Sequence, residues 1–336
     1  MKAAVYKEDK RLVVEDVVDP VPEPNEIVMR VAYCAICGSD LHRYAYSMMS
    51  PGTIMGHEYS GVVVEVGKNV KNWKVGDRVT RCGGKPAPGR DLPNFPPRFS
   101  AQERGFLPQM PGAYAEYMAV HEEKVMPIPE QVSDLESSLV EPLNVAVHAI
   151  RASKVKLGDN AAVLGVGPIG LFVQQCARLA GASRVYVSDV NPARLKVAKV
   201  LGADGAFNPE HTDFVQEIVS QTEIGADVAF ECAGAKPTLQ QAMNVVRMNG
   251  QVVLVSLAWE PVHFLPVEWV GREVELKSCY GHLNSEWLVS MMLVKEKRVQ
   301  VEPIISKVIN LEQIDEAFRE LLAKDNDLVQ VVVKCT

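Results

Sequence analysis

The stretch "NAAVLGVGPIGLFVQQCARLAG", residues 160–181, decides the fold. Its first part, "NAAVLGV", predicts a buried strand, and "IGLFVQQCARLAG" predicts a helix that ends at a C-cap glycine. Gly165, Gly167 and Gly170 lie between them and fit the pattern G-x-G-x-x-G. Such glycines permit a tight turn and a close approach of the backbone, so that a pyrophosphate can lie at the helix N-terminus.

An acidic residue in the right place strengthens this prediction. Asp189 stands at the end of the next predicted strand, about 20 residues beyond the glycines. Its carboxylate is placed to accept both ribose hydroxyls of NAD and to repel the 2′-phosphate of NADP. Arg194, one turn into the following helix, is expected to lie along the adenine. The alternative is a glycine-rich turn in another kind of α/β protein, which this context disfavours.

Residues 143–280 continue the alternation of strands and helices. Strands are predicted at "SRVYVSD", "ADVAFECAG", "GQVVLVS" and "EVELKSC", and helices at "PARLKVAKVLG" and "TLQQAMNVV". Apolar strands that alternate with helices predict a parallel sheet covered on both faces. This is the pattern of a doubly wound α/β domain.

The flanking parts have a different pattern. Residues 1–142 are β-rich, with short valine-rich runs such as "RLVVEDVV", "EIVMRVAY", "YSGVVVEVG" and "AEYMAV" separated by turns. A proline- and arginine-rich excursion without periodicity fills 81–112. Residues 281–336 contain two amphipathic helices and a closing strand, "LVQVVVKCT", and are expected to return to the first domain.

The composition limits the function classes. A chain of 336 residues with a net charge of −7 accommodates about two domains. It lacks the clustered basic charge that nucleic acid or an anionic membrane requires. Its apolar runs are interrupted by glycine and proline and are too short to cross a bilayer. The charged beginning, "MKAAVYKEDKRLVVEDV", does not resemble a signal peptide, so a cytoplasmic protein is expected.

Seven dispersed cysteines indicate thiols or metal ligands and not a disulfide framework. Cys34 and Cys37 form a C-x-x-C, which permits a zinc-knuckle or thioredoxin-like interpretation. There is no second C-x-x-C, and the pair is not expected at the start of a helix after a strand. That interpretation is therefore disfavoured.

A second group of residues indicates a catalytic metal. "CGSDLH" holds Cys37, "IMGHEYSG" holds His57 and Glu58, and "LVEPLNVAVHA" places Glu141 at the domain junction. Cys, His and Glu are the ligand types of a catalytic zinc, which keeps one coordination position open. Individually, His57 would be an ordinary core or surface histidine and Glu58 a solvated charge, but the combination favours a metal site.

Taken together, "CGSDLH", "GHEYSG", "GDRV", "GAYAEY", "VEPL", "GVGPIG" and "FECAG" resemble the zinc-dependent medium-chain dehydrogenase/reductase superfamily. Its branch of sorbitol, butanediol and threonine dehydrogenases is the most similar. The resemblance covers nearly the whole chain. It implies a GroES-like β domain around a Rossmann domain, with an active site in the cleft between them. It further implies NAD-dependent oxidation of a secondary alcohol, such as a polyol, to a ketone.

The resemblance also implies roles for individual residues. Cys37, His57 and Glu58 would bind zinc, and Glu141 would lie beside the fourth position as a base or as a ligand itself. Asp40 would orient His57. Ser39 would pass the alcohol proton through the cofactor ribose to His42, whose ordinary pKa suits release to solvent. The cofactor contacts implied in this way, which ordinary strand-end packing would also explain in part, are Ile169, Val255, Ser256, Leu257, Cys279, Tyr280 and Gly281.

The chain departs from its family in two places. Most relatives carry a structural zinc on four closely spaced cysteines after "GDRV", whereas this chain has only Cys82 there. One catalytic zinc and no structural zinc is therefore expected. Where sorbitol dehydrogenases present two tyrosines and an arginine to the polyol, this chain has Arg43, Gly281 and His282. These residues suggest a substrate with a carboxylate, phosphate or other acceptor group, to which arginines of the excursion would add if it folds over the cleft: Arg90, Arg98 and Arg104. The alternative is that Arg43 pairs with a surface acid or with the cofactor phosphates and does not contact the substrate.

Two rival functions remain at this point. A zinc-free quinone or enoyl reductase of the same superfamily would keep the glycine turn but not the Cys37, His57 and Glu58 set. A non-catalytic cofactor-binding scaffold would keep both without turnover. The expected partners are a small alcohol and further copies of the chain, as a homodimer or homotetramer joined along "EVELKSC".

Overall fold

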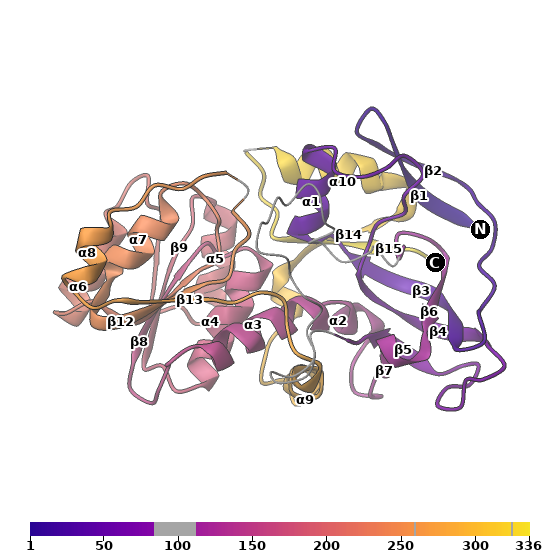
Figure 1. The fold of residues 1–336 in the computed structure, drawn as a ribbon, viewed down its shortest axis with the longest axis horizontal. Coiled ribbons are helices and arrows are strands. Elements are labelled where there is room, and N and C mark those ends of the chain that lie inside the picture. Colours follow the sequence, from indigo (N-terminus) through magenta and orange to yellow (C-terminus); the bar gives the residue numbers. More distant parts are fainter. Residues whose placement is uncertain (84–111, 259, 324) are drawn as a thin grey trace.

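The computed structural model describes residues 1–83, 112–258, 260–323 and 325–336. Two β-sheets lie side by side along the long axis of the molecule, one built mostly from the middle of the chain and the other from both of its ends (Figure 1). Among the described residues, no helix is both long and apolar enough to cross a membrane.

The first sheet is the parallel sheet that the sequence predicts. Its six strands follow the order β10-β9-β8-β11-β12-β13, and every neighbouring pair is parallel. This is the order of a Rossmann fold, in which the connections reverse direction between β8 and β11. The strands are β8 (Asn160–Leu164), β9 (Arg184–Ser188), β10 (Gly205–Phe207), β11 (Ala226–Glu231), β12 (Val246–Leu254) and β13 (Glu275–Ser278).

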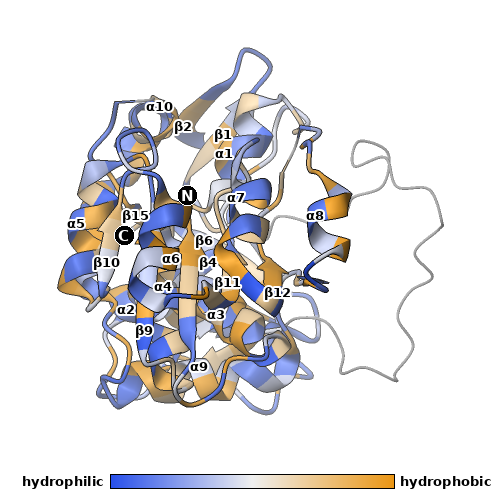
Figure 2. Ribbon diagram, turned by 90° about the vertical axis from the view of Figure 1, so that its left-hand side faces the viewer, coloured by the Kyte–Doolittle hydropathy of each residue, from blue (hydrophilic) through white to orange (hydrophobic). Residues whose placement is uncertain are grey.

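Helices cover both faces of this sheet because its strands alternate two sets of apolar side chains. Val163, Val187 and Phe230 face one cluster and Ala162 and Tyr186 the other. Figure 2 shows apolar residues along these strands and mixed polarity on the helices around them. The first cluster packs against α3 (Val140–Ala152), α4 (Pro168–Leu179), α5 (Pro192–Val200) and α9 (Trp287–Lys295), and the second against α6 (Phe214–Thr222) and α7 (Thr238–Val245). A short helix, α8 (Pro266–Val270), precedes β13.

The second sheet joins the two ends of the chain. Its order is β14-β15-β3-β4-β5-β7, with β6 also paired to β3. The pair β14 and β15 is parallel, and the other pairs are antiparallel. Its members are β3 (Glu26–Ala35), β4 (Glu58–Val66), β5 (Arg78–Arg81), β6 (Tyr117–His121), β7 (Val125–Pro127), β14 (Ile305–Asn310) and β15 (Gln330–Lys334).

The remaining elements pack around this second sheet. The antiparallel pair β1 (Lys2–Lys7) and β2 (Arg11–Asp16) shares a core with β3 and with α10 (Ile314–Leu322), and α2 (Asp134–Ser138) packs across β3 and β4. Short 3-10 helices occupy Glu122–Lys124, Asn284–Glu286, Glu302–Ile304 and Leu311–Gln313. The C-terminal helix α10 thus packs in the cluster of the N-terminal elements, whereas α9 packs in the cluster of the parallel sheet, and the domain bounds 1–142, 143–280 and 281–336 stay predictions.

One expectation about local structure is wrong. Cys37 does stand at the start of a helix after a strand, because β3 ends at Ala35 and α1 (Gly38–Ala45) begins immediately after it. Cys37 is the N-cap residue of α1, and its sulfur accepts the N–H of Ser39. This helix could not be predicted from the sequence, because cysteine is not a usual N-cap residue and residues 38–45 are largely polar.

Candidate active site and metal centre

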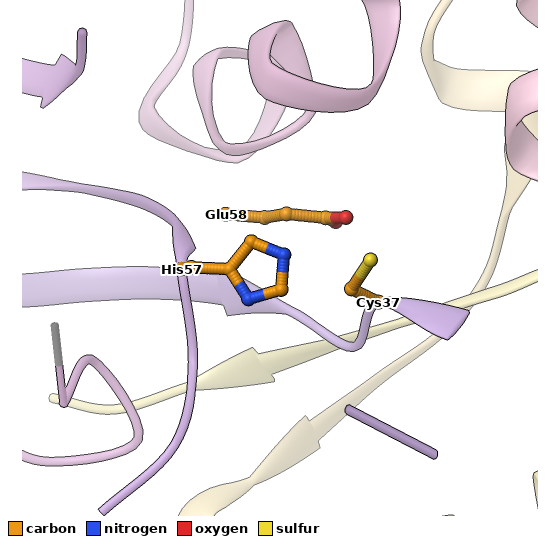
Figure 3. Close-up of side chains that lie close together, drawn as sticks. All are labelled: Cys37, His57 and Glu58. Carbon is orange, nitrogen blue, oxygen red and sulfur yellow. The ribbon is translucent and has the colours of Figure 1, made fainter. Parts of the chain in front are cut away.

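Three side chains that the sequence singled out converge on one point. Cys37 follows β3, His57 directly precedes β4, and Glu58 is the first residue of β4; the two strands are antiparallel with Ala35 opposite Glu58. This register brings Cys37 beside the start of β4. The ligand atoms of Cys37, His57 and Glu58 all lie within 4.8 Å of one another. Figure 3 shows the three side chains gathered together, with the Cys37 sulfur near the end of the Glu58 side chain.

The chemistry of this cluster fits a zinc ion. Glu58 is 2% exposed, and its Oε2 accepts no hydrogen bond from the described residues. A buried carboxylate oxygen without a partner is costly unless a cation or proton satisfies it. Burial raises the pKa of the Cys37 thiol to about 11, and burial together with the Glu141 charge raises the pKa of Glu58. One sulfur, one nitrogen and one oxygen donor form a typical catalytic zinc set.

Asp40 lies behind the imidazole, as the sequence predicts. It is fully buried, and its Oδ1 lies 3.3 Å from His57 Nδ1. This leaves Nε2 as the nitrogen available to a metal. Tyr114 donates its hydroxyl to Asp40 Oδ2 at 2.6 Å, and this oxygen also lies 3.3 Å from the Cys37 backbone nitrogen. The carboxylate is thus fixed in the direction in which it can orient the histidine.

Glu141 lies near the cluster but is held by other groups. It is carried by the first turn of α3, and its Oε1 lies 3.6 Å from Arg81 Nη1 and 3.4 Å from His282 Nε2. Burial alone would raise the pKa of Glu141, but His282 and the Arg81 charge outweigh burial and lower it. Arg81 also donates to the backbone oxygen of His57 at 2.8 Å. Glu141 is therefore an ionised carboxylate held by Arg81 and His282.

Helix α1 carries the residues predicted to move the proton and bind the substrate. Ser39 Oγ lies 3.3 Å from Cys37 Sγ and donates to it. His42 stacks on Tyr46 with ring centroids 6.1 Å apart, and burial lowers the pKa of His42. Arg43 is buried beside these groups. His282, the second predicted substrate residue, packs edge-on against Trp287 and contacts Glu141, so it already has partners within the protein.

The glycine turn has the shape that a pyrophosphate needs. Gly165 has a φ of 87°, and a Cβ there would lie 2.7 Å from Ala233; a Cβ at Gly170 would lie 1.9 Å from the Gly165 oxygen. Gly167 is the N-cap of α4, receives no side-chain cap, and faces open space. Uncapped N–H groups at an open helix N-terminus fit an anion.

Asp189 stands beside this turn, directly after β9. Its Oδ2 accepts the N–H of Val166 at 2.8 Å, and its Oδ1 accepts that of Asn191 at 2.9 Å. Arg194 Nη1 lies 3.9 Å from Asp189, and Arg194 Nε donates to the Leu328 oxygen at 3.4 Å. The adenine contact expected of Arg194 stays a prediction.

The other predicted cofactor residues lie at the same edge of the sheet. Val255, Ser256 and Leu257 directly follow β12, and Cys279, Tyr280 and Gly281 directly follow β13. Ile169 lies in the first turn of α4. Since carboxyl ends of parallel strands share one edge, these residues flank the glycine turn. Their contacts with a cofactor stay predictions.

Sequence reasoning missed three residues of this region. Arg81 has no local pattern that marks it. Tyr114 and Glu231 lie within "GAYAEY" and "FECAG", motifs that were noted for their resemblance but not for these side chains. Residues 84–111 of the excursion, with Arg90, Arg98 and Arg104, lie outside the described residues. The contribution of these arginines to substrate binding stays a prediction. Cys82 is described and is a free thiol.

Two family profiles match the chain. Residues 23–130 match the alcohol dehydrogenase GroES-like domain, and residues 168–296 match the zinc-binding dehydrogenase profile.

Individual proteins are similar over the whole length. The chain is 35% identical to (R,R)-butanediol dehydrogenase of Bacillus subtilis over 99% of both chains, and 32% identical to sorbitol dehydrogenase of the same organism over 99% of this chain and 97% of that one. The crystal structure of 2R,3R-butanediol dehydrogenase from Bacillus subtilis is similar with a TM-score of 0.85 at 34% identity over 99% of both chains. A zinc-binding dehydrogenase from Sinorhizobium meliloti, in a crystal structure bound to NADP, has a TM-score of 0.86 at 26% identity over 99% of this chain and 98% of that one.

Proposed function

The chain belongs to the zinc-dependent alcohol dehydrogenase family with a GroES-like domain, and from this premise we propose that it oxidises a secondary alcohol of a small hydroxylated compound to a ketone with NAD. The observation that carries the proposal is the convergence of Cys37, His57 and Glu58 within 4.8 Å. A zinc-free quinone or enoyl reductase does not require these buried metal-ligand side chains, so this first rival function is disfavoured.

Cys37, His57 and Glu58 would hold the zinc. When bound there, zinc supplies a Lewis acid that lowers the pKa of the substrate hydroxyl. Glu58, which lies in the cluster, is favoured over Glu141 as the third ligand, because Arg81 and His282 already hold Glu141. Ionised Glu141 would remain beside the site and accept a hydrogen bond from the substrate or from water.

Ser39 and His42 would remove the hydroxyl proton. Ser39 would accept this proton from the substrate, and His42 would take the proton up and release it to solvent. Because burial lowers the pKa of His42, the imidazole is neutral near neutral pH and can accept a proton. Ser39→Ala is expected to slow turnover while zinc content and NADH binding stay the same. Unchanged turnover would mean that the proton leaves by another route.

Asp189 supports NAD over NADP. Its carboxylate is fixed by Val166 and Asn191 next to the glycine turn, where it would accept ribose hydroxyls and repel a 2′-phosphate. The alternative is use of NADP, the cofactor bound in the crystal structure of the relative from Sinorhizobium meliloti. Equal kcat/KM values for the two cofactors would contradict the role given to Asp189.

The substrate class is proposed from the relatives and from Arg43. Butanediol and sorbitol dehydrogenases point to a vicinal diol or polyol. The buried Arg43 on α1 would favour a substrate that also carries an anionic or acceptor group. Because His282 contacts Glu141, its contribution to substrate binding would be indirect.

One experiment tests the proposal as a whole. Purified protein, prepared without chelator, is analysed for metals and assayed for NADH formation over a panel of diols, polyols, amino alcohols and hydroxy acids. We expect one zinc per chain and turnover of at least one class. Turnover without zinc would favour the zinc-free reductase, and zinc without any turnover would favour the cofactor-binding scaffold.

A further inference from the structure

A buried carboxylate outside the metal site ties together the three segments that end beside the glycine turn. Glu231, the last residue of β11, is 1% exposed. Its Oε1 accepts the backbone N–H groups of Ala233 and Gly234 at 3.0 and 2.9 Å, and the hydroxyl of Thr238 at 2.7 Å. Its Oε2 accepts the hydroxyl of Ser256. One side chain thus satisfies four donors from the loop after β11, from α7 and from the end of β12.

The backbone of the same residue adds to this arrangement. The Glu231 carbonyl oxygen accepts the N–H groups of Val255 and Ser256 at 2.9 and 3.0 Å. Ser256 is therefore held by Glu231 through both its backbone and its hydroxyl. These contacts fix the direction in which the chain leaves β12.

The loop that Glu231 holds packs directly on the glycine turn. A Cβ on Gly165 would lie 2.7 Å from Ala233, and a Cβ on Gly234, whose φ is 67°, would lie 3.3 Å from the Ser256 Cβ. A displacement of residues 233–234 would therefore move against Gly165 on one side and Ser256 on the other. The geometry leaves little room for the loop to relax.

The position of Glu231 in the sheet identifies which half of a dinucleotide it serves. In the order β10-β9-β8-β11-β12-β13, Asp189 follows β9 on one side of β8, while Glu231 and Ser256 follow strands on the other side. A dinucleotide bound at the point where the connections reverse puts one nucleotide on each side. With the adenosine ribose at Asp189, the nicotinamide half falls beside Ser256.

We propose that Glu231 is a positioning residue for the nicotinamide half of the cofactor, acting through Ser256 and the loop of residues 232–235. The inference rests on the proposed use of a nicotinamide dinucleotide. Glu231 itself touches neither substrate nor metal. It fixes the shape of the surface on which the nicotinamide ribose lies.

The test compares NADH with 5′-AMP, which represents the adenosine half alone. Glu231→Leu removes every acceptor of the side chain and takes the shared partner from four partly buried donors, which should raise the Kd of NADH at least about tenfold. The Kd of 5′-AMP, measured by calorimetry, should stay within about twofold of wild type, since Asp189 is untouched. Glu231→Gln keeps an oxygen for the three donors and can donate to Ser256, so it should restore most of the NADH affinity.

Asp227→Asn is the matched control. Asp227 lies at the opposite end of the same strand, where it accepts the N–H of Asn160 at 2.8 Å and Arg247 Nε at 2.7 Å. The Asp227→Asn variant should have a lower melting temperature, while its Kd for NADH and its Kd for 5′-AMP should stay unchanged. If Glu231→Leu does not fold, Glu231→Gln decides: a small loss of affinity for NADH alone supports the proposal.

The outcomes separate the inference from the proposed function. A wild-type protein that binds no NADH would overturn the proposed function. Wild-type binding of NADH with no loss in either Glu231 variant would overturn the inference, and so would equal losses for NADH and 5′-AMP, which would indicate general damage to the fold.

Discussion

At the scale of single residues, the partners of Glu141 decide how the carboxylate behaves. Arg81 and His282 lie 3.6 and 3.4 Å from the same oxygen, and together they lower the pKa of Glu141 against the effect of burial. Arg81 also holds the backbone of His57. One arginine thus connects the ionised carboxylate with the backbone of a candidate zinc ligand.

Replacing Arg81 is predicted to impair catalysis without loss of metal. Arg81→Leu removes a cation beside Glu141 but no ligand side chain, so zinc content should persist while kcat/KM falls about 10- to 100-fold. Arg78→Leu is the control, since Arg78 lies on the same strand but pairs with Asp134 at 2.7 Å. Steady-state kinetics and metal analysis of both variants provide the measurement. Equal losses of kcat/KM in the two variants would contradict a specific role for Arg81.

Tyr114 offers a second test at this scale. Tyr114→Phe removes the hydroxyl that fixes Asp40, which in turn orients His57. The rate of zinc release to a chelator should rise about tenfold. Tyr6→Phe is the control, because the Tyr6 hydroxyl is equally buried but has no hydrogen-bond partner among the described residues. If both variants release zinc at the wild-type rate, the Tyr114 hydroxyl does not support the metal site.

At the scale of elements, an ion pair joins the segment that follows α9 to α2. Glu136 accepts the backbone N–H and hydroxyl of Ser133 in a capping box, and its other oxygen accepts Lys297 Nζ. Burial opposes ionisation of Glu136, but Lys297 and Ser133 outweigh burial and lower its pKa. The C-terminal segment is thereby fastened to a helix that packs across β3 and β4.

This pair should make stability depend on pH. The folded-state pKa of Glu136 lies below its unfolded value, so the stabilisation is complete above the unfolded pKa and is lost as pH falls through the folded one. Lys297→Met should lower the free energy of unfolding by about 0.5 to 1 kcal/mol near neutral pH, a range suited to a pair with an exposed lysine. Urea unfolding across the acidic range should show this difference vanish. Lys295→Met, at a lysine without an ion pair to a described residue, should show no such difference at any pH.

Periodicity predicted most elements of residues 160–278 because each of these buries a regular apolar face, but it missed the short strand β10 and the helices α6 and α8. Helix α5 starts at Pro192, and β11 and β12 appear where alternation with helices requires them. The short strands β5, β7 and β14 were not predicted, since partners far along the chain stabilise them. The site shows the same difference between local and long-range signals. Cys37, His57 and Glu58 lie in short local motifs and could be predicted, whereas Arg81 reaches Glu141 only through tertiary packing and could not.

At the scale of the whole molecule, β13 ends the order of the six-stranded sheet among the described residues. Shortly before β13 in the chain, α8 leaves apolar side chains in solvent: Val267 is 70% exposed and Val270 is 76% exposed. An open strand edge beside an apolar patch is a template for pairing with another chain. We propose that two copies associate there, as a dimer or as half of a tetramer.

Charged residues in this patch should break the assembly. The double variant Val267→Glu, Val270→Glu is expected to shift the mass measured by light scattering to that of a smaller species. Val75→Glu is the control and should leave the mass unchanged, because Val75 is 62% exposed but lies between β4 and β5 of the seven-stranded sheet. A wild-type protein that is monomeric at all concentrations would contradict self-association.

The seven-stranded sheet also has a consequence for how the protein is made. Gln330, in β15, bonds to Ile36 across a separation of 294 residues, one position before Cys37. At about 5 to 20 residues per second, a ribosome needs roughly 15 to 60 seconds to synthesise that interval. Throughout this time β3, which ends two residues before Cys37, has no β15 beside it. The nascent thiol is therefore open to oxidants and to competing metal ions long before the pocket that shields it can close.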